Sequence, residues 1–256
     1  MRDVEVHLRA VQERIVAAAR RAGRDANEVC LVAVTKGQPP EMIWAAYELG
    51  VRHFGENRVE EAEAKADRLP PDITLHMIGH VQSRKAERVV SLFQMVHSVD
   101  SVKLARRLDL KSAGRAAPLP ILLEFNLSGE GSKYGFRADQ WAHDKAWKEE
   151  LFRAIEEIVT LPHLQIQGLM TMAPIVANPE QARPVFARLR QLRDELAAAF
   201  PQVYWRHLSM GMTDDFEVAI EEGATLVRIG RAIFAPDQLA WCPLPSTESK
   251  GWFSRR

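Results

Sequence analysis

The chain has 256 residues, of which 46% are hydrophobic and 27% are charged, an ordinary composition for a globular protein with a sizeable core. Basic and acidic residues number 34 each, so the balanced charge gives no electrostatic footprint for nucleic acid or an anionic membrane surface. No apolar run approaches the ~20 residues that span a bilayer. The two cysteines, Cys30 and Cys242, make no disulfide framework, and we expect a cytoplasmic protein.

The first expected element is a helix, because apolar residues recur on one helical face near the amino terminus. These residues are Val4, Leu8, Val11, Ile15 and Ala18. Gly23 is a typical helix stop, and the apolar run at 29–34 that follows it is short and rich in β-branched residues. Such a run is typical of a strand buried on both faces, as in a parallel sheet.

Strand-like and helical segments then alternate along the chain. Further strands are expected near 51–54, 74–78, 93–97, 119–125, 164–169, 203–208 and 225–228. Helices are expected between them, near 40–50, 56–68, 81–91, 101–113, 139–161, 179–200 and 214–222. With the first run this makes eight strands, so we predict an α/β fold, a single (β/α)8 TIM-type barrel with an extra amino-terminal helix.

Two boundaries are less regular than the rest, the start of the helix at 179–200 and the end of the domain. Pro184 lies inside the helical pattern at 179–200, so that helix starts late or is kinked. The predicted domain covers residues 1–235, because residues 236–256 contain Pro and Ser without any periodicity. We interpret them as an irregular or partly disordered tail.

Lys36 follows the first predicted strand almost directly. In a barrel the carboxyl ends of the strands form the active face, where a lysine among dry neighbours loses hydration. Its free amine is then a nucleophile towards aldehydes. Position alone favours the ordinary alternative, a lysine whose ammonium group extends into solvent.

The last two predicted strands each run into a glycine turn. Gly230 follows the last strand, where backbone N–H groups can cradle a phosphate and Arg228 can aim a planar donor into the barrel mouth. After strand seven, Ser209 and the adjacent N–H groups suit a phosphate, and Thr213 or Asp214 suits a helix cap. Plain glycine turns and capping explain the same residues.

Two further strand ends carry polar residues. Asn57 follows the second strand, where it can donate to a ring oxygen of a ligand or cap a helix. His76 and His80 flank Gly79 after the third strand, but no cysteine or carboxylate cluster joins them, so no metal site is expected. A barrel brings all these strand ends to one mouth.

Several of these stretches, in the same order over about residues 1–235, resemble the pyridoxal phosphate homeostasis protein family. They read VAVTK at 32–36, FGEN at 54–57, HMIG at 76–79, SKYGF at 132–136, GLMTM at 168–172, LSMGM at 208–212 and VRIG at 227–230. The family's fold is similar to the barrel domain of alanine racemase. One departure is Arg84, which stands where the family's Leu-Gln-x-Asn-Lys stretch has Asn.

The resemblance implies that the chain binds pyridoxal 5′-phosphate (PLP). The implied residues are Lys36 as the imine-forming amine, Ser209 with the backbone of Gly230 and Arg231 at the phosphate, Arg228 at the pyridine nitrogen, and Asn57 near the ring. The family is described as binding and supplying the cofactor without robust catalysis, which would make apo-enzymes that use PLP its partners. We expect a monomer or a weak dimer.

Three functions remain open. The first is a PLP carrier, which we favour because an arginine at the pyridine nitrogen leaves the ring a poor electron sink. The second is a weak amino-acid racemase, which needs an acid–base group on each face of its substrate. Alanine racemase supplies one from a β-rich second domain for which this chain has no room, and Tyr134 is more readily read as a packed or exposed aromatic. The third is a cofactor-free barrel enzyme acting on phosphate sugars.

Overall fold

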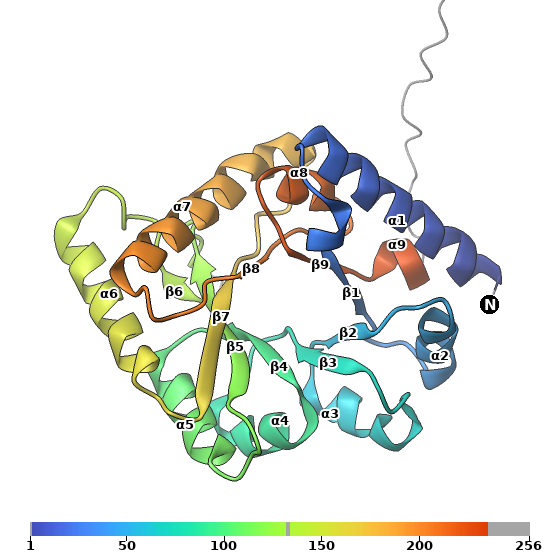
Figure 1. Cartoon of the computed structure of the whole chain (residues 1–256), viewed down its shortest axis with the longest axis horizontal. Coiled ribbons are helices and arrows are strands. Elements are labelled where there is room, and N and C mark those ends of the chain that lie inside the picture. Colours follow the sequence, from blue (N-terminus) through green and yellow to red (C-terminus); the bar gives the residue numbers. More distant parts are fainter. Residues whose placement is uncertain (1, 132–133, 235–256) are drawn as a thin grey trace, which may run out of the picture.

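The computed structural model describes residues 2–131 and 134–234, and it confirms the (β/α)8 barrel. Within these residues eight parallel strands follow one another as β1-β2-β3-β4-β5-β7-β8-β9, and β9 pairs with β1 to close the ring (Figure 1). They are β1 (Cys30–Val34), β2 (His53–Glu56), β3 (Thr74–Met77), β4 (Met95–Val99), β5 (Leu119–Asn126), β7 (Leu164–Met170), β8 (His207–Ser209) and β9 (Leu226–Ile229). The domain limit at 235 stays a prediction, and the predicted tail at 236–256 lies outside the described residues.

The helices form an outer ring around the strands (Figure 1). They are α1 (Arg2–Arg21), α2 (Pro40–Glu48), α3 (Val59–Glu63), α4 (Ala86–Leu92), α5 (Val102–Ser112), α6 (Lys145–Val159), α7 (Arg183–Ala199), α8 (Phe216–Glu221) and α9 (Arg231–Phe234). The extra helix α1 lies beside α8 and α9, and Arg14 on α1 donates to Glu217 on α8 at 2.7 Å.

Helix boundaries depart from the sequence pattern where side chains set them. The predicted helix at 139–161 begins only at α6, because the Asp144 carboxylate accepts the N–H of Trp147 at 3.0 Å and caps it. The helix predicted at 179–200 starts late, as expected: a 3₁₀ turn (Pro179–Ala182) precedes α7, which places Pro184 in the first turn of the helix. Proline is tolerated there because its missing N–H has no partner to lose.

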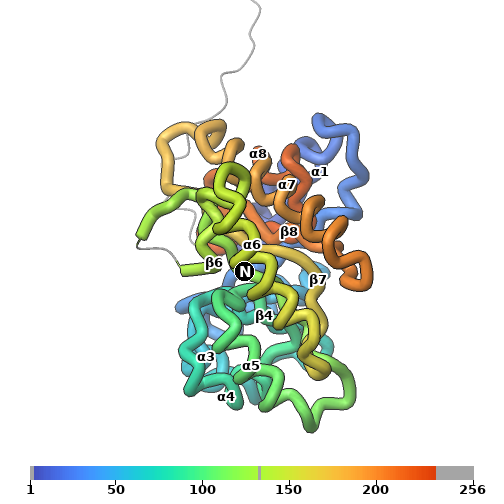
Figure 2. Tube along the Cα trace, turned by 90° about the vertical axis from the view of Figure 1, so that its left-hand side faces the viewer, coloured from blue at the N-terminus to red at the C-terminus, as the bar shows by residue number. Residues whose placement is uncertain are grey.

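One short strand was not expected. β6 (Phe136–Arg137) pairs in parallel with the far end of β5 and continues the sheet beyond the barrel wall. Figure 2 shows β6 beside α6 on one flank of the molecule. Two residues are too few for a periodic signal, so only the partner strand defines this element.

Residues alternate between the two faces of each barrel strand, as a pleated strand requires. Outward side chains such as Ala33, Phe54 and Leu123 join the large apolar layer under the helices. Inward ones form a second, smaller cluster of Val32, Met95, Leu122, Met170 and Leu226. The remaining inward positions of the barrel are largely polar, and they form the site described next.

Gly168 in β7 marks the closest approach of two backbones in the barrel wall. Its φ is +148°, and a Cβ atom built on it would lie 1.9 Å from the carbonyl oxygen of His207 in β8. Only glycine allows β7 and β8 to pair at this distance.

Candidate functional site

Lys36 lies two residues beyond β1, at the carboxyl end of the barrel, and its side chain is exposed. The expectation that its amine is held dry is therefore wrong for this structure, which instead has the alternative that position alone favoured, an ammonium group in solvent. The reason is local, because the chain leaves the strand after Val34 and enters a turn at Lys36 and Gly37. The side chain stands at the mouth, where a ligand from solution can reach it directly.

The main chain on both sides of Lys36 is fixed from outside the barrel by a buried ion pair. Lys65 Nζ lies 2.5 Å from Glu56 Oε1, and both side chains are at most 8% exposed. The same ammonium group donates to the carbonyl oxygens of Thr35 at 3.0 Å and Gln38 at 3.3 Å. The Thr35 hydroxyl in turn donates to Glu56. Lys36 is thus an exposed side chain on an anchored loop.

The Gly230 turn lies against the end of the strand that leads to Lys36. β9 pairs with β1 as far as Ala33 and Ile229, and a Cβ atom on Gly230 would lie 3.0 Å from the carbonyl oxygen of Val34. The small residue lets the two backbones meet. The turn predicted to hold a phosphate is therefore in contact with the strand that leads to the Lys36 amine.

Arg228 and Ser209 meet inside the barrel, just below the mouth. Arg228 is 4% exposed, and its guanidinium donates to Ser209 Oγ at 2.6 Å and to the carbonyl oxygen of Thr171 at 3.0 Å. Burial lowers the pKa of Arg228 to about 10, while the carboxylates of Glu124 and Asp215 oppose this, so it stays charged at neutral pH. Ser209 is fully buried and its hydroxyl accepts from Arg228, so its own hydrogen is shared with His97 Nδ1, 2.9 Å away, or is free for a phosphate.

The loops after β8 and β9 are joined at the surface. Arg231 donates to Asp214 in an exposed ion pair that bridges the two turns. The cap of α8 is neither Thr213 nor Asp214, as the sequence suggested, but Asp215. Its carboxylate accepts the N–H of Met212 at 2.7 Å and closes the loop on itself. Burial raises the pKa of Asp215.

Asn57 follows β2 at the mouth and is half-buried. It is not a helix cap, because α3 begins after Arg58, which has extended backbone at the cap position. Within the described part of the chain, the buried Oδ1 of Asn57 has no hydrogen-bond partner. Buried polar groups are normally paired, so this unpaired amide oxygen needs an explanation and marks Asn57 as a candidate site residue.

Three histidines that the sequence analysis did not assign to the site line the barrel interior. His53 Nδ1 lies 2.9 Å from His76 Nε2, His76 Nδ1 lies 2.8 Å from His97 Nε2, and His97 Nδ1 lies 2.9 Å from Ser209 Oγ. Burial lowers the pKa of His76 to about 3 and that of His97 well below its usual range. The signal that could have found them is a histidine at an inward position in each of three consecutive strands.

Glu124 is a second interior group that the sequence analysis missed. It is 3% exposed, and burial followed by repulsion from Asp100 raises its pKa to about 7, against the pull of Arg228. Asp100 pairs with His80 at 3.0 Å, and the His80 ring stacks on Tyr134 with centroids 3.7 Å apart. Tyr134 is exposed and packs on His80, as an aromatic cover would.

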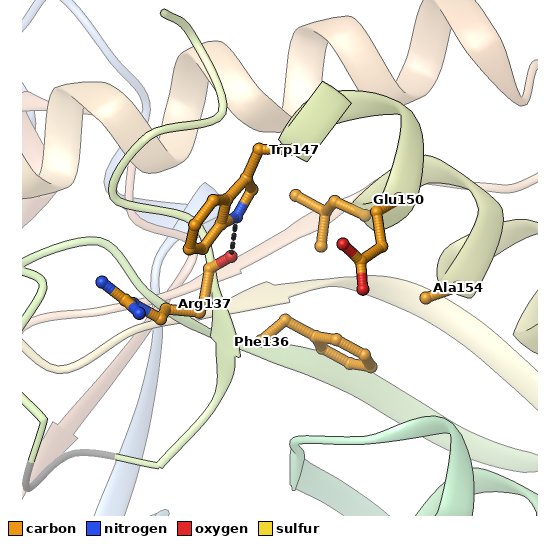
Figure 3. Close-up of a pocket in the computed structure, with 6 residues that line it drawn as sticks. Phe136, Arg137, Trp147, Glu150 and Ala154 are labelled. Carbon is orange, nitrogen blue, oxygen red and sulfur yellow. Dashed lines mark hydrogen bonds between the residues drawn. The ribbon is translucent and has the colours of Figure 1, made fainter. Parts of the chain in front are cut away.

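No other cluster of the described residues competes with this site. They contain no group of three or more His, Cys, Asp and Glu side chains that could hold a metal ion. A pocket on the outside of the barrel lies between β6 and α6, where Trp147 donates to the carbonyl oxygen of Arg137 at 2.9 Å (Figure 3). None of the predicted site residues lines it. In the described residues, no helix is long and apolar enough to cross a membrane.

The mouth of the barrel fits an anionic aldehyde cofactor of the PLP type. It offers a reachable primary amine at Lys36, a buried cation at Arg228, a close turn at Gly230 and an unpaired amide oxygen at Asn57. The fold and this mouth define a (β/α)8 barrel of the alanine racemase N-terminal domain type. The model of that family, "Alanine racemase, N-terminal domain", matches residues 6–237.

Curated relatives make the assignment more specific. A pyridoxal phosphate homeostasis protein of Aquifex aeolicus is 40% identical over 228 residues, which cover 89% of this chain and 95% of the relative. One of Escherichia coli is 35% identical over 243 residues, covering 91% and 97%. The chain therefore belongs to the pyridoxal phosphate homeostasis protein family, as its sequence motifs indicated.

Solved structures agree. A protein of Bifidobacterium adolescentis described as unknown superposes with a TM-score of 0.78 at 37% identity, covering 91% of this chain and 95% of that one. PipY of Synechococcus elongatus, solved with PLP bound, superposes with a TM-score of 0.72 at 36% identity. The superposition covers 88% of this chain and 99% of PipY. An alanine racemase of Clostridium difficile gives 0.70 at 13% identity, covering 91% of this chain and 56% of that one, and shares the fold.

Proposed function

We propose that this protein binds pyridoxal 5′-phosphate at the barrel mouth and serves intracellular PLP homeostasis by holding the cofactor and supplying it to other proteins. The observation that carries the proposal is the contact between the Gly230 turn and the strand that leads to Lys36. It puts the Gly230 turn, to which we assign the phosphate, and a primary amine on one rim. The relatives' name and the PLP-bound state of PipY support the same function.

Each predicted residue has a distinct task in this proposal. Lys36 would hold the aldehyde end of the cofactor through its amine. The backbone around Gly230 and Arg231, together with the Ser209 hydroxyl, would bind the phosphate. Asn57 would contact the ring, and Arg228 would bind at the pyridine nitrogen.

Arg228 favours a carrier over an enzyme. When bound, PLP supplies an electron sink for amino-acid chemistry, and that sink is strongest with a protonated ring. Arg228 keeps its own proton, because its pKa stays near 10 even when buried, and it cannot accept one from the ring. A weak amino-acid racemase is the second candidate, favoured by Glu124, whose pKa of about 7 suits a general acid or base.

The test is trapping of the cofactor on Lys36. The protein is loaded with PLP and reduced with borohydride, and the modified peptide is identified by mass. We expect the adduct at Lys36 and an absorption band that is lost in Lys36→Ala and in Lys36→Arg, which keeps the charge but cannot condense. Lys103→Ala, an exposed lysine on α5, is the matched control and should retain both signals.

The carrier and the racemase give opposite results in deuterated water. A carrier leaves the α-proton of every amino acid in place, whereas a racemase exchanges it in the native protein and not in Lys36→Ala. A colourless protein without any borohydride adduct would defeat both and favour a cofactor-free barrel enzyme. We propose PLP-dependent apo-enzymes as recipients, a monomer or weak dimer as the assembly, and the cytoplasm as the location.

A further inference from the structure

An unbroken line of hydrogen-bonding groups crosses the barrel interior from base to mouth. It begins at His53, the first residue of β2, and passes through His76 in β3 to His97 in β4. The three contacts, 2.9, 2.8 and 2.9 Å, end on Ser209 Oγ, which also accepts from Arg228. His76 and His97 use both ring nitrogens in this line, and His53 uses Nδ1.

The stagger of the barrel strands explains the direction of this line. His53 is level with Thr74, and His76 is level with Gly55 and Met95, so each histidine stands further along its strand's direction than the one before. The last contact crosses the lumen, because β4 and β8 are not neighbours but lie three strands apart around the ring. Half-buried His53 is at the base, and Ser209 is the final residue of β8, near the mouth.

All three rings are neutral near pH 7. Desolvation lowers the pKa of His53, His76 and His97. Charge on His53 or on nearby His207 lowers the pKa of His76 and His97 further, and Arg228 does the same for His97. A neutral imidazole has one donor nitrogen and one acceptor nitrogen. The rings therefore have to order their hydrogens in one of two directions along the line.

The two directions leave Ser209 in different states. In the first, the Ser209 hydroxyl donates to His97 Nδ1, and each histidine carries its hydrogen on Nε2. In the second, each histidine carries its hydrogen on Nδ1, so His97 donates to Ser209. Because Ser209 Oγ then accepts from both His97 and Arg228, its own hydrogen is free for an anion at the mouth.

We propose that His53, His76 and His97 form a proton relay that switches Ser209 into a donor for an anionic ligand at the barrel mouth. The identification of that anion as the phosphate ester of PLP rests on the proposed function. These histidines are positioning residues, because they act on the ligand through Ser209.

The switch takes up one proton and releases one. A phosphate monoester arriving with one proton, near its second pKa of about 6, gives that proton to Ser209 Oγ and stays as the dianion. The original Ser209 hydrogen moves to His97 Nδ1, the His97 Nε2 hydrogen to His76 Nδ1, and the His76 Nε2 hydrogen to His53 Nδ1. The Nε2 hydrogen of His53 leaves to water at the barrel base, so one proton enters and one leaves.

The direct test needs no substitution. Nitrogen-15 spectra of histidine-labelled protein distinguish Nδ1–H from Nε2–H rings, and a purely structural role would not move them. Without ligand we expect the three rings to share the Nε2–H form, because the Ser209 hydroxyl then has His97 as its acceptor. Saturating PLP should convert all three to Nδ1–H together. Rings of mixed tautomer, or rings that do not change with bound ligand, would overturn the relay.

The failure of the relay and the failure of the proposed function give different results. If the protein does not bind PLP, inorganic phosphate replaces it as the probe, and a joint switch with phosphate supports the relay while the proposed function fails. If PLP binds on Lys36 and the rings stay unchanged, the proposed function stands and the relay is wrong.

His76→Phe interrupts the line at its centre without touching Ser209. We expect affinity for PLP to fall about tenfold, the effect of one lost hydrogen bond to a charged group, while affinity for pyridoxal, which lacks the phosphate, is unchanged. His143→Phe is the matched control, since His143 is exposed just before α6, on the outside of the barrel. Equal losses for both ligands, or the same loss in His143→Phe, would contradict a role at the phosphate.

Discussion

Replacement of Glu124 by glutamine should stabilise the protein, and increasingly so as the pH rises. Glu124 is 3% exposed inside the barrel, and its pKa is raised from 4.5 to about 7, first by burial and then by Asp100. The ionised carboxylate is thus held where water cannot solvate it. Glutamine has nearly the same shape and no charge.

The sign and size of the stability change in Glu124→Gln follow from proton linkage. Between pH 4.5 and about 7 the folded chain keeps a proton on Glu124 that the unfolded chain has released, so this group lowers stability as the pH rises. A shift of this size corresponds to ~3 kcal/mol once both states are ionised. The stability gain of Glu124→Gln should therefore grow from ~1 kcal/mol at pH 5 to ~3 kcal/mol at pH 8.

Urea denaturation of the native protein and Glu124→Gln across pH 5 to 8 measures this difference directly, because shared titrations cancel. Asp100→Asn removes one of the two causes of the raised Glu124 pKa. In that background, the stability difference made by Glu124→Gln should depend less steeply on pH. Glu150→Gln, an exposed carboxylate on α6, controls for the loss of one negative charge. A difference between native protein and Glu124→Gln that does not vary with pH would refute the reasoning.

Two further changes test how the scaffold is held. Lys65→Met removes one partner of the buried ion pair and should lower the free energy of unfolding by ~3–5 kcal/mol, a loss that adding Glu56→Gln partly restores; equal losses in the single and double variants would contradict a buried pair. Gly168→Ala brings a Cβ atom to 1.9 Å from the His207 carbonyl oxygen and should cost at least ~3 kcal/mol in thermal or urea unfolding, whereas Gly114→Ala, with open space around it, should be nearly neutral.

The barrel was predictable because its strands are short apolar runs that alternate with helical segments along the chain. The first predicted strand at 29–34 and the observed Cys30–Val34 differ by one residue, since burial on both faces leaves a continuous signal. The helix predicted at 56–68 was less accurate: α3 ends at Glu63, and Lys65 turns inward to its buried partner Glu56. A long-range ion pair leaves no periodic trace.

The site was predictable only in part. Sequence motifs and position along the chain predicted that Arg228 and Ser209 lie at the mouth. Their hydrogen bond, and the contact of Ser209 with His97, depend on which face of each strand points inward. That direction follows from the shear of the closed sheet and not from any one segment. For Lys36 the sequence left two alternatives, a dry amine and one in solvent, because the turn after Val34 that decides between them is set by contacts with distant residues.

The exposed position of Lys36 on its anchored loop has an energetic consequence for whatever binds there. An amine surrounded by water must lose its hydration when it enters a bound state, and that loss is subtracted from the binding free energy. The same loop does not have to be ordered on binding, because Lys65 already holds Thr35 and Gln38 in place. For a ligand that binds at this mouth, desolvation of Lys36 therefore weakens binding, whereas the loop that is already ordered spares an entropy cost.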